Sequence, residues 1–407
     1  MNRTDALFLD ILKAALRGDS YIPEREIDPQ QWEQIMNTAQ EHQLLPMVFE
    51  ASYQLSGFAG TQLQAVLRQQ VMRDVFLQTR KTGEFRNLYR SLRAAGVTPL
   101  VVKGIVCRNL YPQPDYRPSS DEDVLIPEAQ FPACHEAMLA FGMEAGENPD
   151  HFDQVYEIPY GKRGSPVYIE LHKQLFPKDH DAYGELNGFF EGVFDRAVEE
   201  QIEGAAIMTM APTDHLFYLI CHAFKHFLHG GFGIRQVCDI VLFARRYGAQ
   251  ICWERVAENC RQIRAEGFLA AMLAIGTKHL DLDGNAPDNL LPQVDEMPML
   301  EDLLASGIFG SKDEERKHSS SITLGAVARQ KQRNHTSGSL IRSLFPRASS
   351  LEGRYLYLKK YPWLLPIAWI SRLFRFVFKR GGADNAAKTI RLGNERLELL
   401  KQYGILD

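Results

Sequence analysis

Asp121, Glu122 and Asp123 stand just before the apolar segment 124–126. On a β-strand, residues i and i+2 point to the same face, so the two aspartates are expected to lie together while Glu122 points away from them. Hard divalent cations such as Mg²⁺ and Mn²⁺ take oxygen ligands, usually one or two carboxylates together with substrate phosphates. The spacing is therefore typical of half a metal site, although a capped turn before a strand would show the same residues.

A third acid lies within residues 168–172, where polar and apolar residues alternate. Alternation along a strand places Glu170 and His172 on the same face. If this strand lies beside Asp123, Glu170 comes close to the aspartate pair. Three acids on two adjacent strands are the arrangement expected for metal-assisted phosphoryl or nucleotidyl transfer, in which the third acid can activate the attacking oxygen. Together with a Lys-Gly turn further upstream, Glu170 favours the metal site over the capped turn.

The segment that carries these acids is predicted to be a small α/β unit, because short apolar runs alternate with helical patterns and with Gly and Pro. Its expected elements are a strand at 98–102, a helix from Lys103-Gly104 to Tyr111, a strand at 123–126, a helix at 127–141, and a hairpin formed by 152–159 and 167–172.

Helical patterns flank this unit on both sides, and 407 residues exceed what one core usually holds. We therefore expect an α+β protein with a mixed sheet in a small α/β core, flanked by N-terminal and C-terminal helical domains. The expected parts are a helical N-terminal region (1–95), the α/β core (96–176), a helical domain facing the cleft (177–300), and a basic helical C-terminal region (301–407) with a candidate flexible linker at 319–350.

A predicted helix after residue 212 carries a pair of histidines. His222 and His226 are spaced i and i+4 on one helical face, which could hold a metal. No glutamate follows His222 as in an H-E-x-x-H site, and Lys225 places a positive charge beside the pair. A core or substrate-facing histidine pair is therefore favoured, with Arg235 and Asp239 on the next helix as further candidates to line the same cleft.

Charge is distributed unevenly along the chain. The net charge of −5 argues against a protein built mainly to coat nucleic acid. Between residues 312 and 380, however, 15 Lys and Arg face only four Asp and Glu. We interpret this basic region as a solvated helical face. The alternatives are contact with an acidic partner or nucleic acid, and contact of the apolar residues of 361–378 with a membrane surface.

The six cysteines include no C-x-x-C pair, so no zinc or redox motif is indicated and a reducing compartment is favoured. The amino-terminal sequence lacks the apolar core of a signal peptide. No apolar run reaches the roughly 18 to 20 residues needed to span a bilayer. We therefore expect a cytoplasmic protein without a transmembrane segment.

Residues 100–126 resemble a known family. They read Leu-Val-Val-Lys-Gly, then Leu-Tyr-Pro, then Arg-Pro-Ser-Ser-Asp-Glu-Asp-Val-Leu-Ile. This series is similar to that of the uncharacterised nucleotidyltransferases of the DNA-polymerase-beta-like superfamily, in which a strand bearing an acid and a histidine follows. Glu170-Leu171-His172 resembles that strand, and the helix from His215 to His229 resembles the family's helical half. The likeness extends loosely over about residues 40 to 280.

The resemblance implies roles for individual residues. Asp121 and Asp123 would be metal ligands, and Glu170 a third ligand or a general base. Gly104 would let backbone N–H groups approach phosphate, while Lys103 and Arg117 would neutralise phosphate charge. A snorkelling lysine at a strand end is the ordinary alternative for Lys103. The other nucleotide-contacting residues implied are Ser120, His172, His222, His226, Arg235 and Asp239.

One position departs from the family pattern. Glu122 stands where such families usually carry an apolar residue, so its carboxylate must find water or a basic partner. The interval between Gly104 and Asp121 is also longer than in the common superfamily motif.

By this resemblance we expect an enzyme dependent on Mg²⁺ or Mn²⁺ that moves a nucleoside monophosphate from an NTP, ATP first, to a hydroxyl or phosphate. The acceptor would be a small molecule, a peptide or a protein. One alternative is a catalytically silent nucleotidyltransferase fold that binds nucleotide or a partner protein, with Glu122 and the basic tail as its surfaces. Another is a phosphohydrolase that uses the histidine cluster.

Overall fold

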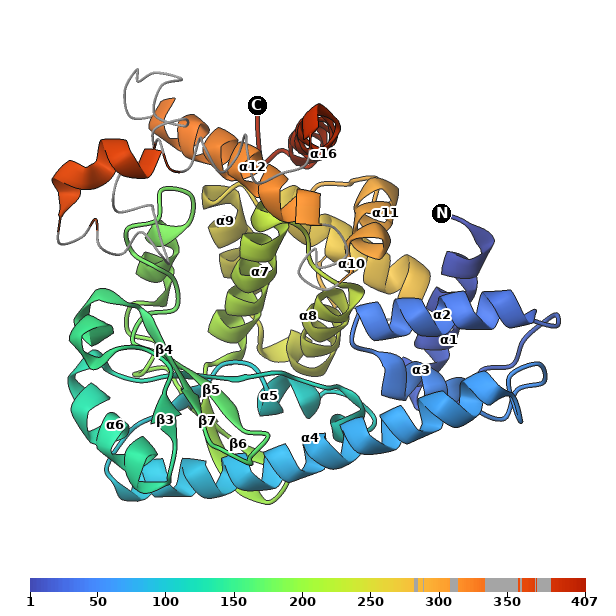
Figure 1. The fold of residues 1–407 in the computed structure, drawn as a ribbon, viewed down its shortest axis with the longest axis horizontal. Coiled ribbons are helices and arrows are strands. Elements are labelled where there is room, and N and C mark those ends of the chain that lie inside the picture. Colours follow the sequence, from blue (N-terminus) through green and yellow to red (C-terminus); the bar gives the residue numbers. More distant parts are fainter. Residues whose placement is uncertain are drawn as a thin grey trace.

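The computed structural model describes residues 1–281, 285–287, 289–307, 314–333, 358, 361–369, 371 and 382–407. At its centre is a five-stranded sheet in the order β1-β2-β5-β4-β3 (Figure 1). β2 and β5 run parallel, and the other neighbours run antiparallel, so the expected α+β class with a mixed sheet is confirmed. The strands are β1 (Leu100–Val101), β2 (Glu122–Leu125), β3 (Glu144–Ala145), β4 (Glu157–Gly161) and β5 (Tyr168–His172).

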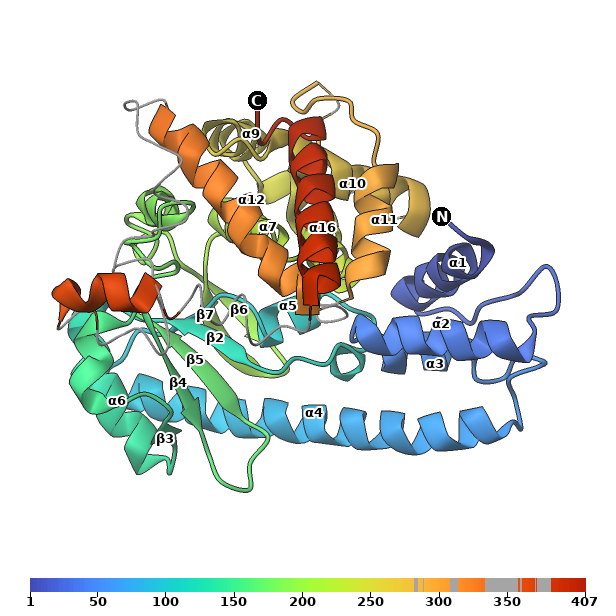
Figure 2. The same cartoon turned by 45° about the horizontal axis from the view of Figure 1, so that its top comes forward.

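One face of the sheet is covered by α4 (Gln62–Ala94) and α6 (Phe131–Ala140), which lie side by side along it (Figures 1 and 2). Val124 of β2 and Leu171 of β5 are fully buried in the cluster formed with these helices. Residues that alternate with this apolar set must therefore point to the opposite face. That face carries the acids.

The opposite face packs against α7 (Pro212–His229) and α8 (Ile234–Tyr247). Val102 and Leu125 belong to the same core cluster as these helices. A buried histidine ties α7 to the sheet, because Nε2 of His215 lies 2.7 Å from the carbonyl oxygen of Val102. α7 is thus held over the face of the sheet on which β2 and β5 carry the acids.

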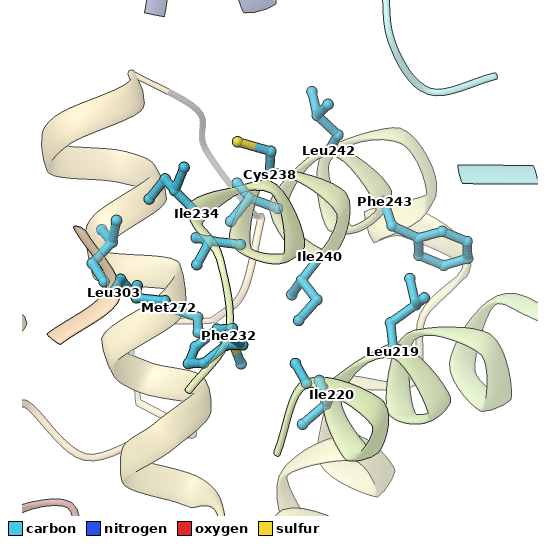
Figure 3. Close-up of a cluster of buried hydrophobic side chains, with 14 of the residues drawn as sticks. Leu219, Ile220, Phe232, Ile234, Cys238, Ile240, Leu242, Phe243, Met272 and Leu303 are labelled. Atoms are coloured by element: carbon cyan, nitrogen blue, oxygen red, sulfur yellow. The ribbon is translucent and has the colours of Figure 1, made fainter. Parts of the chain in front are cut away.

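A buried apolar layer fixes α7 against α8 and α10 (Glu266–Leu280). Figure 3 shows Ile240 of α8 pointing toward Ile220 of α7, with Met272 of α10 beside them. All three side chains are fully or almost fully buried. Truncating such a side chain to alanine costs about 2 to 5 kcal/mol, so this layer keeps α7 in one position.

The amino-terminal residues form the helices α1 (Arg3–Arg17), α2 (Pro29–Glu41), α3 (Leu45–Ser52) and α4. α1 packs on α10, and its buried residues share one core cluster with Leu400 and Tyr403 near the other end of the chain. The division of the chain into four parts stays a prediction. The remaining helices are α5 (Ile105–Arg108), α9 (Trp253–Gln262), α11 (Met297–Ser306), α12 (Glu314–Arg333) and α16 (Gly382–Gln402).

A second hairpin is formed by β6 (Val198–Ile202) and β7 (Ala205–Thr209). It departs from the sequence-based expectation of a helical region at 177–300. Strand β6 is mostly polar, so its sequence shows little of the apolar alternation that indicates a strand. Glu203 and Gly204 join the strands with φ of 49° and 74°. Two positive φ values suit a tight hairpin turn, and this Glu-Gly pair is the signal that could have revealed it.

The predictions for the C-terminal region concern residues that the structure describes only in part. Residues 319–333 of the candidate linker lie in α12, and residues 334–350 lie outside the described part. Trp363 and Ile367 are 73% and 59% exposed, whereas all the basic residues of 334–380 lie outside the described part. The contacts proposed for this region with an acidic partner or a membrane surface therefore stay predictions.

None of the described helices has both the length and the apolar composition needed to cross a bilayer.

Candidate active site

Two of the three predicted acids, Asp123 and Glu170, come together as the alternation indicated. In the parallel pair of β2 and β5, Asp123 lies opposite Glu170 and Leu125 lies opposite His172. Asp121 directly precedes β2, two residues before Asp123, and is partly exposed. Ser120 Oγ donates a hydrogen bond of 3.0 Å to Asp121. The expected adjacency of Asp123 and Glu170 is confirmed.

Asp123, Glu170 and His172 form a group that could hold a metal ion. One ligand atom from each residue lies within 4.8 Å of the others. His172 Nε2 is 3.3 Å from Asp123 Oδ1 and 4.0 Å from Glu170 Oε2. Asp123 and His172 are buried, and the Glu170 side chain is 31% exposed. Glu170 is thus the member that solvent or a ligand can reach.

The two carboxylates of this group have opposite pKa shifts. Burial alone would raise the pKa of Asp123, but Lys103 and His172 outweigh it and hold that pKa well below its usual range. Burial raises the pKa of Glu170 to about 7, and Asp123 and Asp121 add to the shift. Asp123 is therefore ionised at neutral pH, whereas Glu170 exchanges a proton near pH 7.

Lys103 points into this group rather than out to solvent. Its Nζ is 3.2 Å from Asp123 Oδ2 and 3.2 Å from Nε2 of His222. Burial would lower its pKa, but Asp123 and Asp121 outweigh burial and raise it. Lys103 is 8% exposed, so the snorkelling alternative is wrong. The lysine remains charged beside the acids.

The departure at Glu122 has a structural explanation. Glu122 is fully buried and accepts hydrogen bonds from Arg108 Nη1 at 2.6 Å and from the backbone N–H of Ile105 at 2.7 Å. Lys81 Nζ lies 3.7 Å from the same carboxylate. The basic partner required by the sequence is therefore Arg108, supported by Lys81. The alternative in which Glu122 forms part of an exposed binding surface is therefore wrong.

This arrangement corrects the expectation for Gly104. The first N–H of α5 is bound by Glu122, so it is not open to a phosphate. Gly104 has φ of 55°, and a Cβ atom there would lie 1.9 Å from Glu122 Oε2. Glycine is needed here because a carboxylate occupies the place of its side chain.

Arg117 and Asp239 bind each other instead of facing the acids. Arg117 donates from Nε at 2.7 Å and from Nη2 at 2.5 Å to the two oxygens of Asp239, and Tyr111 donates to the same carboxylate. Arg117 is 1% exposed. Burial alone would raise the pKa of Asp239, but the charge and hydrogen bonds of Arg117 outweigh burial and lower that pKa below its ordinary value. The pair is electrically neutral, so the expectation that Arg117 neutralises phosphate and that Asp239 lines the cleft is wrong.

Arg235 supports the same loop from α8. Its Nη1 donates to the carbonyl oxygen of Pro118 and to Gln43, and the side chain is 4% exposed. Burial lowers the pKa of Arg235 to about 10, and Arg117 nearby adds to that shift. Arg235 and Arg117 thus fix the segment that leads into the aspartates.

The histidine pair lies near the acids, because Nε2 of His222 is 3.2 Å from Nζ of Lys103, and its contact with a substrate stays a prediction. The rings of His222 and His226 are 4.6 Å apart, and both side chains are partly exposed. Burial, followed by Lys103, lowers the pKa of His222 well below its usual range. Because an ammonium stands beside His222, a cation held between the two histidines would be repelled. A metal site at this pair is disfavoured.

Three neighbouring residues were not predicted from the sequence: Lys81, Arg108, and Glu157, whose Oε2 lies 3.6 Å from Nδ1 of His172. A signal existed for Lys81, because Gln78, Lys81 and Thr82 interrupt the buried face of α4 with polar side chains at helical spacing. A buried polar stripe usually serves a partner elsewhere in the fold.

A cavity of about 570 Å³ lies elsewhere, between α1 and residues 19–27. It is lined by acidic and basic side chains in similar number, including Asp10, Lys13 and Glu24, and none of the acids above contributes to it.

Comparison with known proteins agrees with this geometry. A family described as "Uncharacterised nucleotidyltransferase" matches residues 28–281, close to the extent of the resemblance noted above. No curated protein and no solved structure matches. The matched part contains the whole five-stranded sheet, α7 and α8, and with them every residue of the site. The chain belongs to the uncharacterised nucleotidyltransferase family.

Proposed function

We propose that this protein is a metal-dependent nucleotidyltransferase that moves a nucleoside monophosphate from an NTP to a hydroxyl or phosphate oxygen of an acceptor. The family supplies the reaction class. The single observation that carries the proposal is the pairing of Asp123 with Glu170 on adjacent parallel strands, with Asp121 two residues upstream. Asp123 and Glu170 on one face of the sheet, with Asp121 just before β2, supply the oxygen donors that bind a divalent cation in nucleotidyl transfer.

The residues present fit Mg²⁺ or Mn²⁺. Asp123 and His172 would hold the cation together with Asp121, and Glu170, the partly exposed member of the group, would remain free to act as the base. Asp123 Oδ2 is buried, and none of the described groups forms a hydrogen bond with it, so the oxygen remains open to a ligand beside its ion-pair contact with Lys103. When bound, the cation would offset charge on the attacking and leaving oxygens of the transfer.

In this proposal Glu170 accepts the acceptor's proton. A new bond forms between the acceptor oxygen and the α-phosphorus, the bond from the α-phosphorus to the bridging oxygen breaks, and pyrophosphate leaves. A base with a pKa of about 7 is half deprotonated at neutral pH, which suits proton transfer under those conditions. Lys103 stands beside Asp123 and offsets part of the negative charge of the acids.

The test is transfer of label from α-³²P-NTPs. Each of the four nucleotides is incubated with the protein, MgCl₂ or MnCl₂, and a lysate that supplies the acceptor. We expect a labelled product with the wild type and none with Asp121→Ala/Asp123→Ala. The matched control is Asp150→Ala/Asp153→Ala, which removes two exposed aspartates outside the site. Label that appears equally with all three proteins would refute the proposed chemistry.

A further inference from the structure

One face of α7 is open to solvent above the acids. His222, Lys225, His226 and His229 are partly exposed, whereas most residues of the helix are buried. Spacings of three and four residues place all four on one face. Because His222 contacts Lys103, this face begins at the site and extends away from it along the helix.

Lys225 lies where α7 approaches the strand side of the site. Its Nζ is 3.4 Å from the hydroxyl oxygen of Tyr156, and it lies 5.6 Å from the centre of the Tyr156 ring and 5.9 Å from that of Tyr183. The Tyr156 ring is in turn 6.1 Å from the ring of His172, which contacts Asp123. One side chain, that of Tyr156, thus lies between Lys225 and His172 of the candidate metal group.

The charge of Lys225 is not balanced by a carboxylate of the described part of the chain. Three other basic groups near the acids pair with a carboxylate, Lys103 with Asp123, Arg108 with Glu122 and Arg117 with Asp239, while Arg235 is buried and donates to the Pro118 carbonyl. The aromatic faces of two tyrosines hold the ammonium in place through cation–π contacts. A charged, positioned and partly exposed lysine is a site for an anion.

We propose that Lys225, with the Tyr156 hydroxyl, binds the β- and γ-phosphates of the NTP and the pyrophosphate that leaves. This inference rests on the proposed function, since it places the rest of the NTP relative to the acids. Lysine binds phosphate as a point charge, and its position beyond His172 suits the end of the nucleotide that extends away from the reacting phosphorus.

A nucleobase fits this place less well. His180 already stacks on the Tyr183 ring, with centroids 3.7 Å apart and an interplanar angle of 10°. The Tyr183 hydroxyl is 2.9 Å from Nε2 of His229. Because one face of the Tyr183 ring and its hydroxyl are already in contact with histidines, a nucleobase has little surface for stacking there. The ammonium of Lys225 is better suited to an anion.

The experiment measures binding of ATP, AMP and inorganic pyrophosphate by calorimetry in the presence of MgCl₂. Lys225→Met keeps the length of the stem on the tyrosine rings but removes the charge. We expect affinity for ATP and pyrophosphate to fall at least tenfold, with affinity for AMP changed less than twofold. Lys225→Arg keeps the positive charge and should retain most of the wild-type affinity for ATP and pyrophosphate. Lys162→Met is the matched control, since it removes a lysine that also lies over an aromatic ring, outside the site.

The outcomes separate this inference from the proposed function. Unchanged binding of ATP and pyrophosphate by Lys225→Met would overturn the role of Lys225, whatever the acids do. Metal-dependent ATP binding that survives Asp121→Ala/Asp123→Ala would overturn the proposed function, while a selective loss in Lys225→Met would still support the phosphate site. A wild-type protein that binds none of the three ligands would overturn both.

Discussion

Gly104 and Glu122 fit together only because one of them has no side chain. A Cβ atom on Gly104 would lie 1.9 Å from Oε2 of Glu122, a distance at which one group must move. Glu122 in turn binds the Ile105 N–H and Arg108. The turn after β1 and the residue between the two aspartates are therefore one structural unit.

Gly104→Ala is expected to lower the free energy of unfolding by about 3 kcal/mol or more. The substitution combines strain at positive φ with displacement of a buried carboxylate from its cation. Urea denaturation provides the measurement. Gly60→Ala is the control, because Gly60 also has positive φ but has nothing within 4 Å of an added Cβ; it should cost about 1 kcal/mol. Equal losses in the two variants would contradict the steric argument.

Arg108→Met should cost about 3 kcal/mol or more, because it leaves the Glu122 charge buried beside Lys81 alone. Adding Glu122→Met should recover part of that loss, since the double variant no longer buries this unpaired carboxylate. A double-mutant cycle by chemical denaturation measures the coupling. Arg80→Met breaks an exposed ion pair with Glu84 on α4 and should cost less than about 1 kcal/mol. Additive effects at Arg108 and Glu122 would argue against the pairing.

Glu170→Gln should lower kcat by about 100-fold or more, because the variant cannot accept a proton. In the wild type, kcat/KM should fall as pH drops below about 7, where Glu170 becomes protonated. The variant should lack this limb of the pH profile. A wild-type limb that persists in Glu170→Gln would assign it to another group.

The same substitution should stabilise the protein at alkaline pH. The pKa of Glu170 is raised on folding, so its protonated form is favoured in the folded state and its contribution to stability is lost as pH rises through about 7. At pH 8, Glu170→Gln should therefore unfold at a higher temperature than the wild type in metal-free buffer. A lower temperature would show that the carboxylate is stabilising.

His215 should make the protein sensitive to mild acid. Burial lowers its pKa to about 4, so protonation is favoured in the unfolded chain, and stability present above pH 6.5 is lost as pH falls toward 4. Between pH 7 and pH 5 this one group should remove about 2 kcal/mol. His215→Gln should reduce the difference in unfolding free energy between these two pH values by that amount. An unchanged difference would mean that His215 is protonated equally in both states.

Local patterns predicted the parts of the site that depend on strand geometry. Alternation placed Glu170 and His172 on one face, and the pairing of β5 with β2 brought that face beside Asp123. Arg117 and Asp239 show the opposite case. They are separated by 122 residues, and both looked like cleft residues until packing of α8 against the loop brought them into contact.

The sequence by itself determined the family, the α/β core and the face of the sheet that carries the acids. It could do so because alternation, Gly turns and residue spacing act over a few residues. Only the tertiary structure decided which charges face the ligand and which are neutralised internally. Glu122 looked like a flaw between two catalytic aspartates, and it is a buried anchor for Arg108. Lys225 looked like an obstacle to metal binding, and it is a partly exposed lysine whose ammonium contacts the Tyr156 hydroxyl. Charge pairing depends on contacts between distant segments, and those contacts exist only after the helices pack on the sheet.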